Sequence, residues 1–92
     1  MRYEWDGAKN RANFLKHGLR FEDAEKVFSG SCVQFVDDRF DYGEERLIAL
    51  GYLDGRFVVI VHAPFEDGTR IISMRKGARH EENFYFKQFG SD

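Results

Sequence analysis

The chain has 92 residues and a formal net charge of -2, and 42% of its residues are hydrophobic, 16% aromatic and 33% charged. This size fits one globular domain over residues 1–92, and the small net charge excludes a polybasic protein that binds nucleic acid over its whole surface. A single cysteine, Cys32, excludes an intramolecular disulfide and a zinc site made of cysteines. The apolar run at 57–61 is too short for a membrane span and no basic-then-apolar leader opens the chain, so we expect a protein of the reducing cytoplasm.

Charge is unevenly distributed along the chain. Residues 1–30 carry six Lys/Arg and five Asp/Glu, residues 31–69 carry three and eight, and residues 70–92 carry five and three. The two ends are therefore cationic and the middle is acidic. This polarity could orient an anionic ligand, or it could be an ordinary surface of mixed charge.

The first predicted elements are a short strand and a helix. Residues 2–5 alternate polar and aromatic side chains, as in a half-buried strand. Asp6 is a suitable N-cap, and Gly18 a suitable stop, for a helix over residues 8–17. The apolar residues of this helix recur at helical spacing and are expected to face the core: Ala8, Ala12 and Leu15.

The remaining elements are predicted from the spacing of apolar residues, which changes from helical to strand spacing after Gly30. A second helix is predicted between Phe21 and Gly30, with Phe21, Ala24, Val27 and Phe28 as its buried stripe. Strands are predicted over residues 32–36, 46–53, 56–63 and 70–76, with an Asp54-Gly55 hairpin turn, Pro64 as the end of the third strand, and a last helix over 78–89. The order β-α-α-β-β-β-β-α predicts an α+β fold whose mainly antiparallel sheet is covered by helices.

The last helix has one aromatic residue outside its expected core stripe. That stripe consists of Ala78, Tyr85, Phe86 and Phe89. Phe84 falls among polar neighbours instead, so it either contacts a partner chain or a loop, or is an ordinary exposed ring.

Cationic residues cluster in two places. On the first helix, Lys9, Asn13, Lys16 and His17 share a face, which is either a ligand contact or a solvated surface that complements the helix dipole. The second cluster is Arg70, Arg75, Lys76, Arg79 and His80. Strand alternation predicts that Arg70 and Lys76 point to one face of the sheet and Arg75 to the other.

Other groups give weaker signals. His62 lies in the most hydrophobic strand, where a histidine is either a buried, satisfied ring or a proton-transfer group. The three histidines have no metal-ligand spacing, and Cys32 is expected to pack in the core. No phosphate-binding glycine loop and no serine-hydrolase elbow occur, so the sequence gives no support for nucleotide hydrolysis or serine esterase chemistry. We expect neither a cofactor nor a metal.

One family accounts for the joint pattern of these residues. The N-terminal string is Trp5-Asp6, Lys9, Asn13, Lys16-His17-Gly18, Phe21, Ala24 and Val27-Phe28. The C-terminal blocks are Glu45-Arg46, Gly51, the strand 58–62, Arg70-Ile71-Ile72-Ser73, Arg75-Lys76, Glu81 and Tyr85. Over about residues 3–86, the chain resembles the BrnT family of bacterial type II toxins.

The resemblance implies both a fold and a function. It implies a RelE-like fold and a toxin that cleaves mRNA and slows translation, neutralised by a BrnA-type ribbon-helix-helix antitoxin, with operator DNA contacted through that antitoxin. The chain departs from the pattern at Ala63-Pro64-Phe65, where relatives usually have a Thr and an Arg, so one phosphate contact is missing.

Cleavage of RNA without a metal needs a base, cations that stabilise the pentacoordinate phosphate, and an acid. The expected catalytic residues are Arg75 first, then Arg70, Lys76, His17 and His62, gathered in one cationic pocket. Lys9, Lys16 and Arg79 are expected to bind RNA, and Phe84 to bind the antitoxin. The alternative is a non-catalytic module that acts with the antitoxin as a transcriptional co-repressor.

Overall fold

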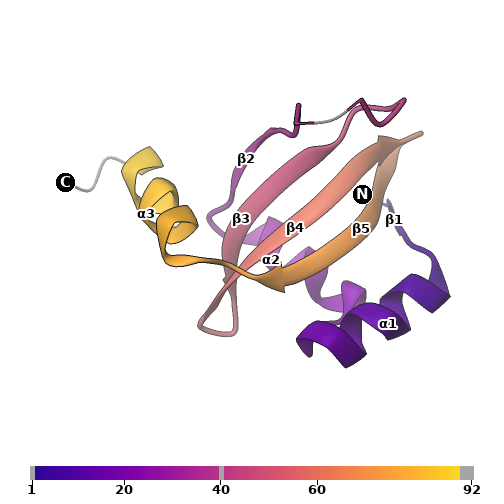
Figure 1. Cartoon of the computed structure of the whole chain (residues 1–92), viewed down its shortest axis with the longest axis horizontal. Coiled ribbons are helices and arrows are strands. Elements are labelled where there is room, and N and C mark those ends of the chain that lie inside the picture. Colours follow the sequence, from indigo (N-terminus) through magenta and orange to yellow (C-terminus); the bar gives the residue numbers. More distant parts are fainter. Residues whose placement is uncertain (1, 40, 90–92) are drawn as a thin grey trace.

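The computed structural model contains a five-stranded sheet in the order β1-β5-β4-β3-β2, and it describes residues 2–39 and 41–89 (Figure 1). The strands are β1 (Arg2–Glu4), β2 (Val33–Val36), β3 (Leu47–Leu53), β4 (Arg56–Phe65) and β5 (Gly68–Lys76). The helices are α1 (Gly7–His17), the 3-10 helix η1 (Phe21–Asp23), α2 (Ala24–Ser29) and α3 (Arg79–Gln88). Neighbouring strands are antiparallel except β1 and β5, which are parallel. The predicted α+β class with a mainly antiparallel sheet is confirmed.

The hairpin between β3 and β4 turns as predicted, because Asp54 and Gly55 both have positive φ, at 51° and 83°. The predicted strand end at Pro64 is wrong. Pro64 pairs with Thr69 of β5, and β4 continues to Phe65. The proline is tolerated there because β3 pairs with β4 only as far as His62, so this end of β4 has one neighbour and needs fewer hydrogen-bond donors.

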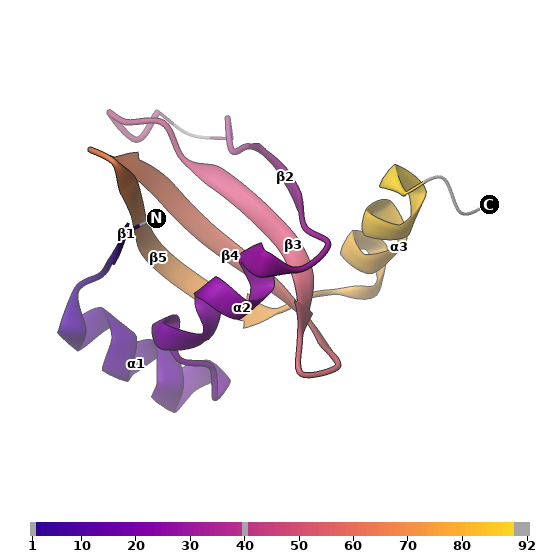
Figure 2. The ribbon, with the colours of Figure 1, turned by 180° about the vertical axis from the view of Figure 1, so that it is seen from behind.

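Helices α1 and α2 cover one face of the sheet, which we call the helical face (Figure 2). The predicted stripe of α2 is confirmed, since Phe21, Ala24 and Val27 are buried and Phe28 packs against them. Gly51 of β3 lies under this helix, where an added Cβ would come within 2.8 Å of Val27 Cγ1. The two elements therefore approach more closely than an alanine would allow.

The predicted core stripe of α1 is wrong. Ala8 and Ala12 are exposed and Leu15 is 85% exposed, whereas Asn13 is buried. The Asn13 amide nitrogen donates to the Leu19 carbonyl oxygen at 3.0 Å, and its Oδ1 accepts from the Met74 amide of β5 at 3.1 Å. Strand β1 pairs only with the start of β5, so the edge of β5 beyond it has free amides that a polar helix face can satisfy.

This reversal makes Asn13 important for stability and Leu15 dispensable. Asn13→Ala leaves a buried amide and a buried carbonyl without partners, and should lower the free energy of unfolding by about 2–4 kcal/mol. Leu15→Ala should change it by less than about 0.5 kcal/mol. Urea denaturation of both variants measures this, and equal effects would contradict the packing described.

Helix α3 lies against the other face of the sheet, at the end where β5 stops (Figure 1). The Tyr85 ring lies 5.6 Å from that of Tyr52 and 5.5 Å from that of Phe57, and the Tyr52 hydroxyl donates to Glu82. Of the predicted stripe only Tyr85 is buried, since Phe86 and Phe89 are about half exposed and Ala78 is exposed. The stripe prediction is therefore wrong for Ala78, Phe86 and Phe89.

Candidate functional site

One extra residue in β5 decides which side chains share a face. Ser73 pairs with Val61 and Ile71 pairs with His62, so Ile72 has no partner and forms a β-bulge. Arg75 pairs with Val59 and Arg70 with Ala63, and these two β4 residues lie on the same face of the sheet. The prediction that Arg70 and Arg75 point to opposite faces is therefore wrong. Both lie on the face opposite α1 and α2, which we call the open face.

A carboxylate of α3 holds Arg75 in place. The Arg75 guanidinium donates to Glu81 Oε1 at 2.9 Å and to Glu81 Oε2 at 2.7 Å, and Glu81 Oε1 also accepts from the Ala78 amide at 2.8 Å. The pKa of Glu81 is lowered, first by the Arg75 hydrogen bonds and also by the Ala78 amide. The Arg75 side chain keeps 41% of its surface exposed. This clamp fixes an oriented guanidinium that solvent or a ligand can still reach.

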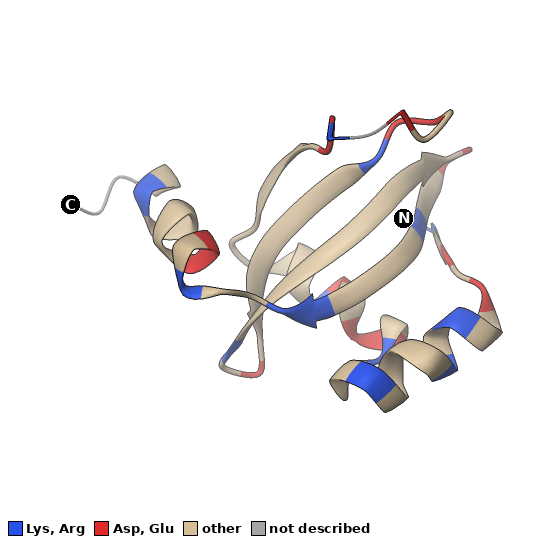
Figure 3. Ribbon diagram, viewed as in Figure 1, with Lys and Arg blue, Asp and Glu red and all other residues tan. Residues whose placement is uncertain are grey.

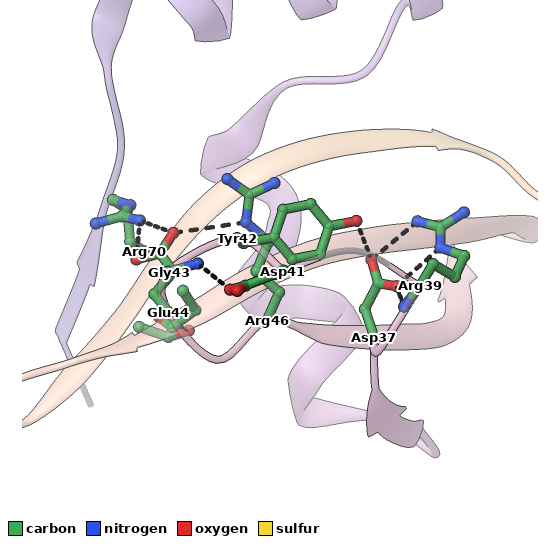
Figure 4. Close-up of polar contacts among 10 residues, drawn as sticks. Asp37, Arg39, Asp41, Tyr42, Gly43, Glu44, Arg46 and Arg70 are labelled. Carbon is green, nitrogen blue, oxygen red and sulfur yellow. Dashed lines mark hydrogen bonds and ion pairs between the residues drawn. The ribbon is translucent and has the colours of Figure 1, made fainter.

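Arg70 is held in a similar way at the other end of β5. Its Nη2 donates to both Glu44 carboxylate oxygens, at 2.7 and 2.6 Å, and Glu44 also lies 3.5 Å from Arg46 Nε (Figure 4). The pKa of Glu44 is lowered, mainly by the hydrogen bond from Arg70. The Arg46 guanidinium lies 4.0 Å from the centre of the Tyr42 ring. The segment between β2 and β3 thus brings carboxylate and guanidinium groups together beside Arg70.

Asp37 anchors a further arginine in the same segment. The buried Asp37 carboxylate accepts from Arg39 Nε at 2.8 Å, from Arg39 Nη2 at 2.9 Å and from the Tyr42 hydroxyl at 3.1 Å (Figure 4). These bonds, those from Arg39 above all, lower the pKa of Asp37 to about 2. The pKa of Arg75 is raised, chiefly by its hydrogen bonds to Glu81, and the charge of Arg39 opposes this only slightly. We call Arg39, Arg46, Arg70 and Arg75 the arginine group.

The structure does not unite the remaining predicted residues with Arg75. His62 and Lys76 belong to the helical face, as their pairing with Ile71 and Val58 shows, and His17 ends α1. The sheet therefore separates Arg75 from both imidazoles, and the predicted common pocket is wrong. Lys9 and Lys16 are exposed on α1, and Arg79 is exposed at the start of α3. Figure 3 shows basic segments at the last turn of α1 and at the junction of β5 with α3.

Sequence reasoning gave no site role to Arg39, Arg46 or His80. His80 directly precedes Glu81 and is within the predicted cationic cluster, so it could have been chosen from it. Arg46 and Glu81 belong to the blocks that carry the family resemblance. Arg39 lies outside regular strands, where no periodicity indicates which way a side chain points.

His62 is a buried, neutral ring. The Thr69 hydroxyl donates to the Ala63 carbonyl at 3.1 Å, so at 2.9 Å from His62 Nδ1 it must accept from that nitrogen. Burial lowers the pKa of His62 to about 4, which keeps the imidazole uncharged at neutral pH. Cys32 packs beside the core as predicted, and burial raises the pKa of its thiol.

Burial of His62 makes stability depend on pH. Its pKa falls from 6.5 in the unfolded chain to about 4 on folding, so between these values the unfolded chain binds a proton that the folded protein does not. The free energy of unfolding therefore keeps its full value above pH 6.5 and decreases by about 3 kcal/mol as the pH falls to 4. Denaturation of wild type and His62→Gln from pH 4 to 7 measures this pH dependence. The difference in free energy of unfolding between the two proteins should change over this range, whereas the difference between wild type and His17→Gln should stay constant.

The described residues contain neither a metal-ligand cluster nor a membrane-spanning helix. Across residues 2–39 and 41–89, no group of three or more His, Cys, Asp or Glu side chains could hold a metal ion. Within the same ranges, no helix has the length and apolar character that crossing a membrane requires.

Residues 5–81 match the family described as "Ribonuclease toxin, BrnT, of type II toxin-antitoxin system". The class of the protein is thus that of the toxins of type II toxin-antitoxin systems, which is consistent with an arginine-lined sheet face suited to phosphate. Within this class, the chain belongs to the BrnT family of ribonuclease toxins. No curated protein matches the chain.

Proposed function

We propose that this BrnT-family toxin has a RelE-like topology and cleaves RNA on the open face without a metal ion, slowing translation in the cytoplasm. The observation that carries the proposal is the Arg75 guanidinium, which two hydrogen bonds to Glu81 hold in place and which is still accessible. Oriented cations of this kind stabilise charge that develops on a phosphate in the transition state.

The reaction proposed is an internal transfer of the phosphate. The RNA 2′-hydroxyl loses its proton and its oxygen attacks phosphorus, and the bond to the 5′-oxygen breaks as that oxygen gains a proton. The products are a 2′,3′-cyclic phosphate and a 5′-hydroxyl. Arg75 stabilises the pentacoordinate phosphate, Arg70 binds a neighbouring phosphate at the other end of β5, and His80, which directly precedes Glu81, transfers protons.

The other predicted residues are assigned by their position. Arg79 begins α3, and we propose that it binds the RNA backbone. We place outside the reaction the predicted residues that lie on the other side of the sheet: Lys9, Lys16, His17, His62 and Lys76.

Replacement of Arg75 tests the site. Arg75→Ala should lower the rate of cleavage of single-stranded RNA by about 100-fold, in buffer containing EDTA, because an oriented cation is lost from the transition state. Arg20→Ala, which changes an arginine of the helical side, is the matched control and should cleave at the wild-type rate.

Arg75→Lys distinguishes a loss of catalysis from a loss of stability, because it retains a charge that can pair with Glu81. It should melt close to wild type and still cleave more slowly, since lysine lacks the planar fork. Unchanged cleavage by both Arg75 variants would contradict the assignment.

A second function, a co-repressor without catalysis, is favoured by the pairing of the arginines. Arg39, Arg70 and Arg75 each contact a carboxylate, which reduces the charge available to an RNA phosphate. Wild-type protein that binds the antitoxin and its operator but never cleaves RNA would support this function.

We also propose that a BrnA-type ribbon-helix-helix antitoxin binds at Phe84 and contacts operator DNA, which the toxin meets only through it. The Phe84 ring is 42% exposed and lies 5.7 Å from the ring of Phe35, which is also exposed. Exposed aromatic pairs are common anchors of protein interfaces.

Replacement of Phe84 tests the anchor. Phe84→Glu should weaken antitoxin binding by about tenfold or more, with little change in melting temperature, because it puts a charge into an apolar contact. Phe14→Glu, at a ring 48% exposed on α1, is the control and should bind normally. Calorimetric titration with the antitoxin measures both, and a large loss of stability in Phe84→Glu would show that the ring is part of the core.

A further inference from the structure

The outward side of helix α1, which lies at the surface of the molecule, is apolar (Figure 2). Ala8, Ala12 and Leu15 recur at helical spacing and are all exposed, and Leu15 keeps 85% of its surface exposed. The inward side is polar instead, since the Asn13 side chain accepts from the Met74 amide of β5. An amphipathic helix normally buries its apolar side, so this stripe lacks, within the described part of the chain, the cover that such a side usually has.

A groove of about 360 Å³ continues the stripe on one side. Its lining residues come from α1 and from the segment that follows it: Asn10, Arg11, Phe14, Leu15, Arg20 and Glu22. The apolar part of the lining is formed by Leu15 and by the Phe14 ring, which is 48% exposed. Asn10 donates to Glu22 Oε1 at 2.9 Å, so this carboxylate already has a partner. We call the stripe and the groove together the α1 face. Its two alanines let the backbone of a partner approach closely, and its groove accepts a larger side chain.

Positive charge surrounds the α1 face. Because a helix advances by about 100° per residue, Lys9 and Lys16 lie on one side of the stripe and Arg11 lies on the other. All three side chains are exposed, and within the described part of the chain none of them forms an ion pair. Helix α1 itself has no acidic residue. An occupant with carboxylates on both sides of an apolar seam therefore matches the charge of this face.

Other occupants fit the α1 face less well. A second copy would bring two cationic helices together, and like charges in contact oppose association. An anionic membrane is disfavoured because two alanines and one leucine on an 11-residue helix provide little apolar area for insertion. An RNA backbone would place phosphates against Leu15, where they make no apolar contact. An acidic amphipathic helix satisfies both the apolar stripe and the cations beside it.

We propose that the α1 face binds an acidic amphipathic helix of a protein other than the antitoxin. Apolar side chains of that helix contact Leu15 and Phe14, and its carboxylates pair with the three cations of α1. The antitoxin is excluded because its proposed anchor, Phe84, lies on α3 at the other face of the sheet (Figure 1). The α1 face also lies across the sheet from the arginine group, so it does not depend on the proposed ribonuclease activity.

Two designed peptides test the charge of the occupant. Both are held helical by a side-chain crosslink and share one leucine seam, and the residues beside the seam are Glu in the first peptide and Gln in the second. In fluorescence anisotropy with the full chain, the Glu peptide should bind about tenfold more tightly at low salt, and high salt should remove this advantage. Equal affinities of the two peptides at low salt would overturn the proposal.

Variants of the chain locate the binding. Leu15→Gln should weaken binding of the Glu peptide by about tenfold without changing the melting temperature, because the side chain is exposed. Val36→Gln, at a residue 53% exposed on β2, is the matched control and should bind normally. Arg11→Gln combined with Lys16→Gln should remove most of the preference for Glu over Gln, whereas Lys87→Gln on α3 should retain it. Equal binding by wild type and Leu15→Gln would contradict the assignment.

The same variant distinguishes the other occupants. We expect that Leu15→Gln changes neither sedimentation of the chain, nor its binding to phosphatidylserine vesicles, nor its binding to a single-stranded oligonucleotide. Loss of any of these in Leu15→Gln would assign the face to a second copy, a membrane or a nucleic acid, and would overturn the proposal. The Glu peptide should also bind the toxin–antitoxin complex as tightly as it binds the toxin. Failure to bind the complex would show that the antitoxin covers the α1 face.

Discussion

The bulge at Ile72 is the constraint on which the arrangement of charge depends. A strand without it would turn Arg70 and Arg75 to opposite faces, because side chains alternate with a period of two. The extra residue restores Arg70 to the face of Arg75, and it leaves Ile71 and Met74 together in the core under the helices. One residue therefore separates a cationic open face from an apolar helical face along the same strand.

Three members of the arginine group are each oriented by a carboxylate. Glu81 of α3 holds Arg75, Glu44 from the segment before β3 holds Arg70, and Asp37 holds Arg39 two residues further on. Such pairs at a partly exposed surface add little stability, but they reduce the rotamer freedom of long side chains. In the proposed reaction, a phosphate would meet guanidinium groups already in position and would compete with the carboxylates for their hydrogen bonds.

Polar groups also hold the elements together where an apolar contact is expected. Asn13 joins α1 to the free edge of β5, and Asn10 accepts from the Phe21 amide at 2.9 Å, which fixes the start of the next helix. The apolar residues of α1 are consequently left outside, with Phe14 and Leu15 exposed. An edge strand that lacks a neighbouring strand must satisfy its amides in another way, and an asparagine on a helix does so here.

The helices, the strands and the α+β class could be predicted from the sequence, because caps, hairpin turns and the period of apolar residues are local properties. The family could be predicted from the resemblance of the residues quoted above. Asp6 accepts from the Lys9 amide, Gly18 takes a left-handed φ of 71°, and the Asp54-Gly55 turn forms, all as the residues predict. The sequence also identified Arg70 and Arg75 as candidates. Three outcomes could not be predicted locally: α1 packs through Asn13, Arg70 and Arg75 share a face, and His62 lies on the opposite face. They depend on strand pairing across the sheet and on the unpaired Ile72, and the local spacing of apolar residues indicates neither.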